Sequence, residues 1–541
     1  MLKELRGSDV IIECLLEQGV DTVFGYPGGA VLNIYDSLYK YSDKIHHVIT
    51  AHEQAACHAA DGYSRTTGRT GVVIATSGPG ATNLVTGIAT AYMDSIPMVA
   101  ITGNVTRDLL GLDSFQEVDI CGITMPITKH NYIVKDPAEL ADIIREAFYI
   151  ANEGRKGPVL IDIPKDITGA LMVYEKKEPK KVVNHNPEGI NEEIAAAAEL
   201  IKNAEKPFIY AGGGVVSADA TEEMAEFVRK VDAPVSLSLM GQCALDNTKD
   251  CYIGMLGMHG TKTAAMTLSE CDLMIVLGSR FSDRVLCNAK TFAKDKKIIH
   301  IDIDPAEIGK NIPVDIPLVG DCKAILSELT QMITPCRRDS WLEELAEIKN
   351  AVPENEETNG YINPKMFLRK LSDKLPANTV CVADVGQNQI WCCNNFAIKE
   401  GGRFLTTGGM GTMGYSVPCG VGAKMAAPDR EVVVVCGDGS FQMQMMELAT
   451  IMQEGIAVKI IIMRNNRLGM VRELQTKNYE DHQIAVHLDG SPDFVALARS
   501  YGIEADRVVT MAEAEEKIDK LVNSDKPYLL ECNVYKLEST L

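Results

Sequence analysis

The residues with the clearest chemical potential are an acidic turn and an asparagine pair. The turn, Gly437-Asp438-Gly439-Ser440, follows an apolar run over 431–436, and Asn465-Asn466 follows a second apolar run over 458–463. Such runs are typical of buried strands in a parallel sheet, whose carboxyl ends share one edge. Mg²⁺ accepts carboxylate and amide oxygens together with bound phosphates. The spacing therefore predicts that Asp438 and Asn465 hold a divalent cation and a diphosphate. The alternative is a simple Gly-Asp-Gly turn beside an unrelated asparagine pair.

The segment between these two runs predicts a single helix. It extends from Phe441 to Gly455, and the glycine is typical of a helix end. The N-terminus of this helix, after Ser440, would offer N–H groups and a positive dipole to the same phosphates.

Composition limits the classes of function that this chain can have. Its 541 residues are too many for one core, and 46% hydrophobic with 23% charged residues is ordinary for a soluble globular protein. A net charge of −21 argues against binding to nucleic acid or to an anionic membrane surface. The 15 cysteines show neither metal-ligand spacing nor a disulfide framework. With no signal peptide or membrane span, and with Met1–Gly7 entering a helix directly, we expect a cytoplasmic protein.

Three segments of alternating apolar strands and helical stretches follow one another along the chain. They cover residues 1–170, 190–335 and 361–541, and they are separated by polar stretches at 174–189 and 340–360. The alternation predicts an α/β protein with three doubly wound parallel-sheet domains. Examples of the expected strands are 72–75, 273–277 and 459–462.

A glutamate in the first segment gains meaning from its surroundings. Glu53 opens an expected helix after a strand at 48–50, where a lone carboxylate would simply complement the helix dipole. Around it stand, in order, Tyr26-Pro27-Gly28-Gly29-Ala30, Asp61-Gly62-Tyr63-Ser64-Arg65 and the run 76–83. This ordered set resembles the pyrimidine-binding domain of thiamine-diphosphate enzymes of the acetolactate synthase group. The resemblance covers essentially the whole chain and implies pyrimidine-binding, central FAD-binding-like and diphosphate-binding domains.

The resemblance implies a catalytic role for Glu53. A carboxyl group hydrogen-bonded to N1′ of the aminopyrimidine favours the tautomer that takes the proton from the reactive thiazolium carbon. An apolar pocket would help this group to hold its proton. In the family this glutamate reaches the cofactor of the other subunit, which implies a homodimer or a dimer of dimers.

The central segment carries glycine-rich motifs at expected strand ends. They are 211–214, 254–260 and 278–284, and glycines there permit close approach of a ligand. The triple glycine alone is weak evidence, because this domain can be empty or bind FAD or ADP. The combination resembles the FAD-binding catalytic subunits of the family. It implies FAD contacts from Arg155, Gly212, Gly213, Gly214, Leu239, Met240, Gly257, His259, Arg280, Asp302 and Asp321.

Other site residues follow from the same resemblance. Arg284 would bind the carboxylate of the incoming 2-ketoacid, the alternative being a surface salt bridge with Asp283. Gln116 would lie over the reacting centre, Phe115 and Lys165 would contact substrate, and the Arg467 carbonyl would be a third Mg²⁺ ligand. The implied contacts with thiamine diphosphate are Pro27, Asn83, Val385, Gly386, Gln387, Asn388, Gly411, Met413, Gly437, Gly439, Ser440, Leu468, Gly469 and Met470.

The chain departs from the family pattern at several places. Asn388 stands where the family usually has His, and Thr106 replaces a common Pro at the channel mouth. Leu474 stands where the family usually has the Trp that narrows the acceptor site, so the acceptor preference is open. The longer C-terminal tail of the family does not follow Leu541, so either water exclusion at the site would be poorer or a partner could supply the closure.

The resemblance as a whole implies a carboligase that uses thiamine diphosphate, Mg²⁺ and FAD. Pyruvate would lose CO2, and its two-carbon unit would join a second pyruvate or 2-ketobutyrate, as in the first common step of branched-chain amino-acid synthesis. Two alternatives stay open: a related 2-ketoacid decarboxylase or carboligase with another substrate, and a non-catalytic homologue. A small regulatory subunit is a further implied partner.

Overall fold

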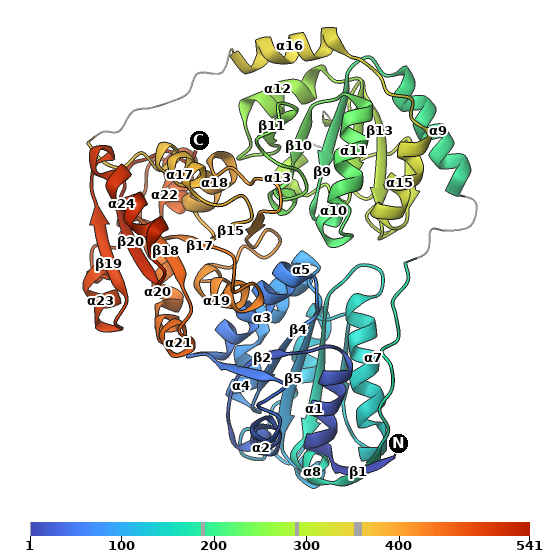
Figure 1. Cartoon of the computed structure of the whole chain (residues 1–541), viewed down its shortest axis with the longest axis vertical. Helices are drawn as coiled ribbons and strands as arrows, with labels where there is room; N and C mark the ends of the chain where they lie inside the picture. The colour runs from blue at the N-terminus through green and yellow to red at the C-terminus, as the bar shows by residue number, and fades with distance from the viewer. Residues whose placement is uncertain (1, 185–189, 287–291, 351–359) are drawn as a thin grey trace.

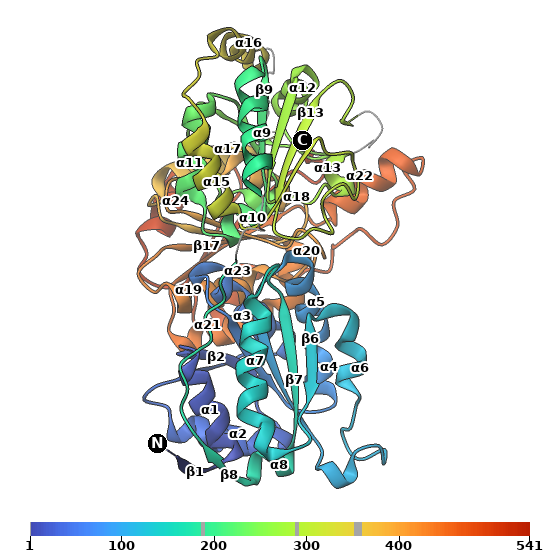
Figure 2. The ribbon, with the colours of Figure 1, turned by 90° about the vertical axis from the view of Figure 1, so that its right-hand side faces the viewer.

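Three six-stranded parallel sheets form the framework of the chain (Figures 1 and 2). The computed structural model describes residues 2–184, 190–286, 292–350 and 360–541. The first sheet has the order β3 (His46–Ile49), β2 (Thr22–Tyr26), β4 (Gly71–Ala75), β5 (Met98–Asn104), β7 (Pro158–Pro164) and β6 (His130–Ile133). The second has β11 (Tyr252–Met255), β10 (Val235–Leu237), β9 (Pro207–Ala211), β12 (Leu273–Leu277), β13 (Lys297–Asp302) and β14 (Ile316–Val319). The third has β16 (Arg403–Leu405), β15 (Val380–Ala383), β17 (Val432–Gly437), β18 (Val458–Arg464), β20 (Tyr528–Asn533) and β19 (Glu504–Val508).

Helices cover the faces of all three sheets. Around the first are α1 (Gly7–Glu17), α2 (Leu32–Lys40), α3 (Glu53–Thr67), α4 (Pro79–Asn83), α5 (Val85–Asp94), α6 (Ile120–Thr124), α7 (Leu140–Asn152) and α8 (Lys165–Gly169). With the second are α9 (Ile190–Asn203), α10 (Gly213–Ser217), α11 (Thr221–Val231), α12 (Lys262–Glu270), α13 (Asp283–Leu286), α15 (Cys322–Met332) and α16 (Asp339–Asn350). With the third are α17 (Pro364–Lys374), α18 (Gln387–Asn395), α19 (Ser416–Ala426), α20 (Asp438–Gln444), α21 (Leu448–Glu454), α22 (Gly469–Asn478), α23 (Phe494–Ser500) and α24 (Met511–Asn523).

The strand orders place a topological switch point in each sheet. The first and third sheets share one order, in which the first strand of the set lies between the second and the third. In the central sheet the first strand, β9, lies between β10 and β12. Ligands of doubly wound sheets bind outside the strand ends at such points.

The predicted fold class is confirmed. Each sheet lies within one predicted segment, but the domain limits stay a prediction, and residues 185–189 and 351–359 of the polar stretches lie outside the described residues.

Two local expectations are wrong. The chain does not enter a helix directly, because Lys3–Arg6 forms β1, which pairs antiparallel with β8 (Leu171–Tyr174), and α1 begins at Gly7. The helix expected between Ser440 and Gly455 is two helices, α20 and α21, separated by a 3-10 turn at Met445–Glu447. This break directs the fully buried Glu447 carboxylate to the backbone N–H of Ala51, at 3.1 and 3.2 Å. Gly455 does end α21, in a left-handed conformation with φ of 63°.

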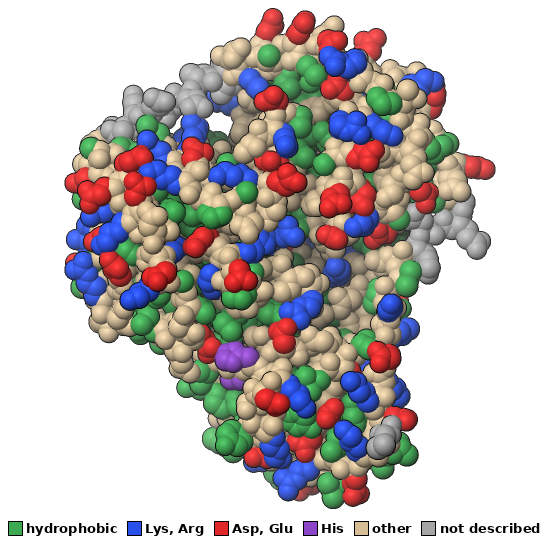
Figure 3. Space-filling model, viewed as in Figure 1, with side chains coloured by type: hydrophobic (Ala, Val, Ile, Leu, Met, Phe, Trp, Pro, Cys, Tyr) green, Lys and Arg blue, Asp and Glu red, His purple; other side chains and the backbone are tan. Residues whose placement is uncertain are grey.

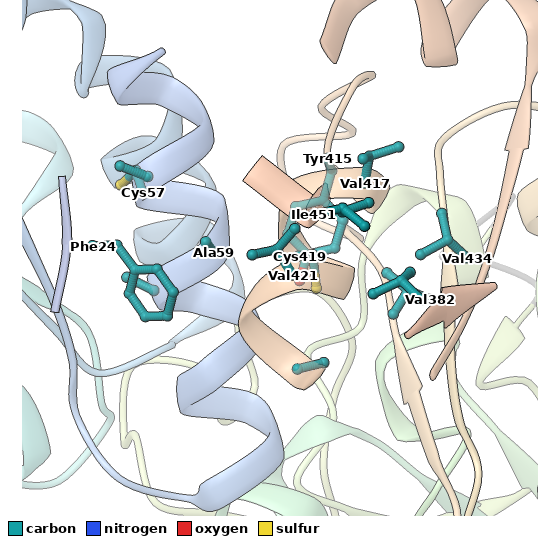
Figure 4. Packing of buried hydrophobic residues seen from close by; sticks show 14 of the residues in the cluster. Phe24, Cys57, Ala59, Val382, Tyr415, Val417, Cys419, Val421, Val434 and Ile451 are labelled. Atoms are coloured by element: carbon teal, nitrogen blue, oxygen red, sulfur yellow. The ribbon is translucent and has the colours of Figure 1, made fainter. Parts of the chain in front are cut away.

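The first and third units share one hydrophobic core through α3 and α19 (Figure 4). Glycines let these two helices come into backbone contact. A Cβ at residue 422 would lie 1.8 Å from the carbonyl oxygen of Ala59, and one at Gly62 would lie 2.3 Å from that of Cys419. The packing therefore fixes the position of the segment that opens with Glu53 relative to the third sheet.

Charged side chains of both signs are interspersed over the face in Figure 3. No helix in the described part of the chain combines the length and apolar character needed to cross a lipid bilayer.

Candidate active site

The acidic turn lies at the switch point of the third sheet. Asp438 follows β17 and begins α20, and its carboxylate accepts from the backbone N–H of Gly439 at 2.9 Å and of Asn466 at 2.6 Å. Burial raises the pKa of this carboxyl to about 6. The contact with Asn466 joins the turn to the asparagine pair, as the motif predicts. No cluster of three or more His, Cys, Asp or Glu side chains suited to a metal occurs in the described chain.

Asn465 is buried and its amide is held at both ends. Its Nδ2 donates to Gln387 Oε1 at 3.0 Å, and its Oδ1 accepts from the backbone N–H of Arg467 at 2.9 Å. The Arg467 guanidinium pairs with Asp489 at 3.1 Å and donates to the Asn466 carbonyl at 2.7 Å, which leaves the Arg467 backbone carbonyl as the group of interest. Ser440 Oγ accepts from the Gly437 N–H at 3.1 Å and closes the turn.

The glycine-rich loop over 408–414 is tied down by two buried carboxylates. Asp384 accepts from the N–H groups of Gly414 at 3.0 Å and Ser416 at 2.9 Å, and burial raises the pKa of this carboxyl. Asp94, from the first unit, accepts from the N–H of Gly408 at 3.2 Å and of Gly409 at 2.7 Å. Arg65 pairs with Asp94 at 2.9 Å, so the anchor is itself fixed.

Met413, a predicted contact of the cofactor, faces the acidic turn from this loop. A Cβ at Gly439 would lie 2.7 Å from Leu468 Cδ2 and 3.8 Å from Met413 Cε, so the three residues meet at one place. Gly411 has a φ of 68° and stands exposed in the same loop. Val385 and Gly386 follow β15 at the other side of the switch point, and Gly386 has a φ of 140°.

Glu53 is the first residue of α3 and is oriented by Asn83. Its Oε2 accepts from Asn83 Nδ2 at 2.9 Å. Thr76, after β4, lies against Gly28 and accepts from the Ala30 N–H at 3.3 Å, which holds the turn containing Pro27 near the same strand ends. The first sheet thus gathers Pro27, Glu53 and Asn83 at its own switch point.

Gln116 lies against Gly78 near this group, and its backbone is strained. Its φ is 60°, a conformation that costs about 1–3 kcal/mol in a residue other than glycine. Gly78 also has a φ of 60°, and a Cβ there would lie 2.9 Å from Cβ of Gln116. Phe115 beside it is 88% exposed, and Lys165 is also exposed at the start of α8. These two predicted substrate contacts therefore face solvent in the single chain.

The triple glycine of the central unit has a packing role of its own. A Cβ at Gly212 would lie 2.3 Å from the Gly278 carbonyl oxygen, and one at Gly214 would lie 2.6 Å from Gly278 Cα. Gly213 lies against Met240, which also lies against Gly408 of the third unit. The glycines thus bring the ends of β9 and β12 together at the switch point, whatever ligand binds there.

Several predicted FAD contacts also hold the protein together. Arg155 pairs with Asp304 at 3.1 Å and Glu307 at 2.8 Å, and Asp321 caps α15 through the Ala324 N–H. Burial raises the pKa of Asp302 to about 6 and lowers that of His259. Leu239 and Met240 form a 3-10 turn after β10, Gly257 has a φ of 122°, and Arg280 is half-buried after β12.

The acceptor end is more open than the cofactor end. The Arg284 guanidinium is 68% exposed, with Met258 Sδ at 3.7 Å and Asp283 at 3.8 Å. At that distance Asp283 leaves the guanidinium free to bind a carboxylate. Leu474 on α22 is 49% exposed. Asn388 is buried, and its Nδ2 donates to the carbonyls of Asp384 at 2.7 Å and Val435 at 3.4 Å.

The two halves of the predicted site lie on different sheets of the chain. Glu53, Asn83 and Gln116 gather at the first sheet, and Asp438, Asn465 and Met413 gather at the third. Within the described residues, no hydrogen bond or ion pair joins Glu53 to the Asp438 cluster.

Comparison with known proteins shows where this arrangement belongs. Models of the thiamine pyrophosphate enzyme N-terminal TPP binding, central and C-terminal TPP binding domains match residues 5–123, 194–329 and 384–532. The chain is 46% identical, over 97% of its length, to the probable acetolactate synthase large subunit of Methanocaldococcus jannaschii, of which 91% is covered. It is 42% identical, over 99% of its length, to the acetolactate synthase isozyme 2 large subunit of Escherichia coli K12, of which 96% is covered.

The chain belongs to the acetolactate synthase family. A third relative, the acetolactate synthase of Arthrospira platensis, is 45% identical over 99% of this chain and 95% of its own. The predicted family and the thiamine-dependent enzyme class are therefore confirmed. The roles of single residues stay predictions.

Several residues that shape the loops of this site carry little or no signal in the sequence. Asp94, Asp384 and Glu447 are buried carboxylates that accept backbone N–H groups of loops next to the predicted site. Asp384 had a weak signal, since it directly follows the apolar run 380–383. Asp94 and Glu447 had none, because their partners lie in another unit of the chain.

Proposed function

We propose that this protein is the catalytic subunit of an acetolactate synthase. It decarboxylates pyruvate and joins the remaining two-carbon unit to a second 2-ketoacid, giving 2-acetolactate or 2-aceto-2-hydroxybutyrate. This is the first common step of branched-chain amino-acid biosynthesis. The observation that carries the proposal is the pairing of Glu53–Asn83 at one switch point with Asp438–Asn465 at another, in a chain that matches all three thiamine-enzyme domains.

The residues at the third sheet fit a metal-bound diphosphate. Asp438 is a buried carboxylate whose ionised form a cation would stabilise. Asp438, the Asn465 amide oxygen and the Arg467 carbonyl would hold Mg²⁺, and Gly439, Ser440 and the turn at 385–388 would contact the diphosphate. Bound thiamine diphosphate supplies the electron sink that accepts the electron pair left when the carboxylate departs as CO2.

Protein side chains then control protons and orientation. Glu53, held by Asn83, exchanges a proton with N1′ of the aminopyrimidine, and Met413 supports the cofactor from the loop anchored by Asp94 and Asp384. Arg284 binds the carboxylate of the acceptor, and Gln116 lies over the reacting carbons. In the overall change, the donor C1–C2 bond breaks, a bond forms to the acceptor carbonyl carbon, and that carbonyl oxygen takes up a proton.

FAD at the central sheet is part of the proposal. Gly212 and Gly214 bring the backbone that follows β9 against Gly278 after β12, at the switch point where doubly wound sheets bind dinucleotides. A yellow protein with a flavin absorption spectrum after purification supports FAD binding. A colourless protein that cannot be loaded with FAD defeats this part.

Partners and location follow from the family. We infer a homodimer or dimer of dimers in which Glu53 serves the cofactor site of the partner chain, and a small regulatory subunit, since relatives are named large subunits. The described cysteines are all free, as is usual in a reducing cytoplasm.

The decisive assay is product analysis. The purified protein with pyruvate, thiamine diphosphate, Mg²⁺ and FAD should form acetolactate. Acetaldehyde as the only product would replace the synthase with a decarboxylase. A competition between pyruvate and 2-ketobutyrate then measures acceptor preference, which the half-exposed Leu474 leaves open.

A further inference from the structure

Gln387, the first residue of α18, stands at the centre of a buried hydrogen-bond network. Its side chain accepts from Asn465 Nδ2 through Oε1 at 3.0 Å. Its Nε2 lies 3.0 Å from Glu473 Oε1, 3.2 Å from Thr540 Oγ1 and 2.8 Å from the Glu538 carbonyl. Gln387 is only 4% exposed, so these partners determine which way its amide points.

The segment 538–540, called the strap below, connects α18 to α22. Trp391 Nε1 of α18 donates to the Ser539 carbonyl at 2.9 Å, and Arg472 Nη2 of α22 donates to the Glu538 carbonyl at 3.0 Å. The Glu473 carboxylate accepts from the Thr540 N–H at 2.8 Å and from its Oγ1 at 2.6 Å. Thr540 is 3% exposed and anchors the strap in the protein, whereas Glu538 is half-buried and Ser539 is exposed.

The backbone is shaped to admit this amide. A Cβ at Gly469, the first residue of α22, would lie 1.8 Å from Gln387 Oε1 and 3.0 Å from Asn465 Nδ2. Any other residue at 469 would displace the Gln387 side chain. The position of Gln387 between α22 and Asn465 is therefore built into the helix start.

An amide can present either its oxygen or its nitrogen, and only the oxygen binds a cation. The acceptor Oε1 of Gln387 holds the Nδ2 end of Asn465, so Oδ1 is the atom that faces the turn at 465–467. If Gln387 rotated, its own Nε2 would face Nδ2, and Asn465 would lose this control. Glu473, Thr540 and the Glu538 carbonyl together oppose that rotation because all three accept from Nε2.

We propose that Glu473 and Thr540 are positioning residues that act through Gln387 to keep the Asn465 oxygen directed at the divalent cation. The proposal rests on the proposed function, because it needs Mg²⁺ and thiamine diphosphate at this turn. Residues that orient a metal ligand commonly change metal affinity by about 10- to 100-fold when mutated.

Two near-isosteric variants of the full-length protein test the proposal. Thr540→Val removes the hydroxyl, and Glu473→Gln replaces one acceptor oxygen by a donor. We expect each to weaken Mg²⁺ binding at saturating thiamine diphosphate by about 10-fold in calorimetric titration, and to shift the Mg²⁺ activation curve equally. Thr540→Ser keeps the hydroxyl and should show the same Mg²⁺ binding and Mg²⁺ activation curves as the wild type.

Ser539→Ala is the matched control within the strap, because Ser539 contributes its backbone carbonyl to the network. It should bind Mg²⁺ like the wild type. A lowered melting temperature with an unchanged Mg²⁺ curve in Thr540→Val and Glu473→Gln would overturn the proposal and leave a purely structural strap.

The binding titration separates this inference from the proposed function. A wild-type protein that binds Mg²⁺ with thiamine diphosphate but forms no acetolactate would defeat the synthase reaction, and the variants would still support or overturn the positioning role. A wild-type protein that binds no Mg²⁺ in the presence of the cofactor would overturn both.

Discussion

At the scale of single residues, the bond between Glu53 and Asn83 places the key carboxyl group. Asn83 donates to only one oxygen of Glu53, at 2.9 Å, so the other is available to a ligand. A carboxyl group held in this way can exchange a proton with a ring nitrogen without first being reoriented.

The variant Glu53→Gln should keep the fold and lose turnover. The amide oxygen of Gln still accepts from Asn83, but the amide cannot transfer a proton. Acetolactate formation should fall by about 10²- to 10⁴-fold, the usual contribution of general acid–base catalysis. Steady-state assays and a circular-dichroism melt check both parts. Unchanged turnover would favour a non-catalytic homologue.

A second residue makes stability depend on pH. Asp162 is 2% exposed at the carboxyl end of β7, and burial raises its pKa from 3.8 to about 7, although Thr102 and Asn104 donate to it. Asp119 is a nearby acidic group that raises the pKa further. The folded state therefore holds a proton that the unfolded state releases at lower pH.

The protonated Asp162 therefore adds to the free energy of unfolding. This contribution is complete below about pH 4 and is lost as the pH rises through about 7. The shift corresponds to at most about 4 kcal/mol. Denaturant titrations at several pH values should show a free energy of unfolding that falls between about pH 4 and about pH 7. Asp162→Asn should reduce this slope, and an equal slope in the variant would assign it to other groups.

At the scale of secondary structure, the α3–α19 contact connects the first and third units. Both helices carry small residues where they touch, so their backbones approach closely and the units share one core (Figure 4). The helix that opens with Glu53 can move relative to the third sheet only if this core is disturbed.

Gly422→Ala should disrupt that contact. Its Cβ would lie 1.8 Å from the Ala59 carbonyl oxygen, which is backbone and cannot rotate away. We expect a loss of at least about 1–3 kcal/mol of stability, measured by denaturant titration. Gly490→Ala is the control, because a Cβ there meets nothing within 4 Å. Equal stability of both variants would show that the helices move apart at little cost.

At the scale of the whole molecule, the two halves of the site lie on different sheets. We propose that each half is completed by the partner chain, and the exposed positions of Phe115 and Arg284 leave room for such a partner.

Mixing two inactive variants tests this assembly. If Glu53 serves the partner's cofactor, co-expressed Glu53→Gln and Asp438→Asn chains should form mixed dimers in which one of two sites is intact. Random pairing then restores about a quarter of wild-type activity. Each variant alone should be inactive. Mixed samples that stay inactive, although native mass spectrometry shows mixed dimers, would place the whole site within one chain.

The sequence alone determined the strands and the residues at their ends. Runs such as 273–277 and 380–383 are apolar throughout, as buried parallel strands must be, and the structure places strands at those residues. Asp438 and Asn465 were predictable because each follows such a run directly, and parallel strands end at one edge. The helix break before Glu447 was not predictable, because it depends on a contact with Ala51 in another unit.

Tertiary structure decided how these residues are held. Asp94 and Gly409 are 315 residues apart in sequence, and Gln387 and Thr540 are 153 apart, so no local pattern indicates either contact. Their partners become known only when the units pack, because a buried polar group accepts whichever donor the packing brings near. Local hydrophobic pattern therefore gave the sheets and the chemical groups at their edges. The packing of distant segments determined the orientation of those groups.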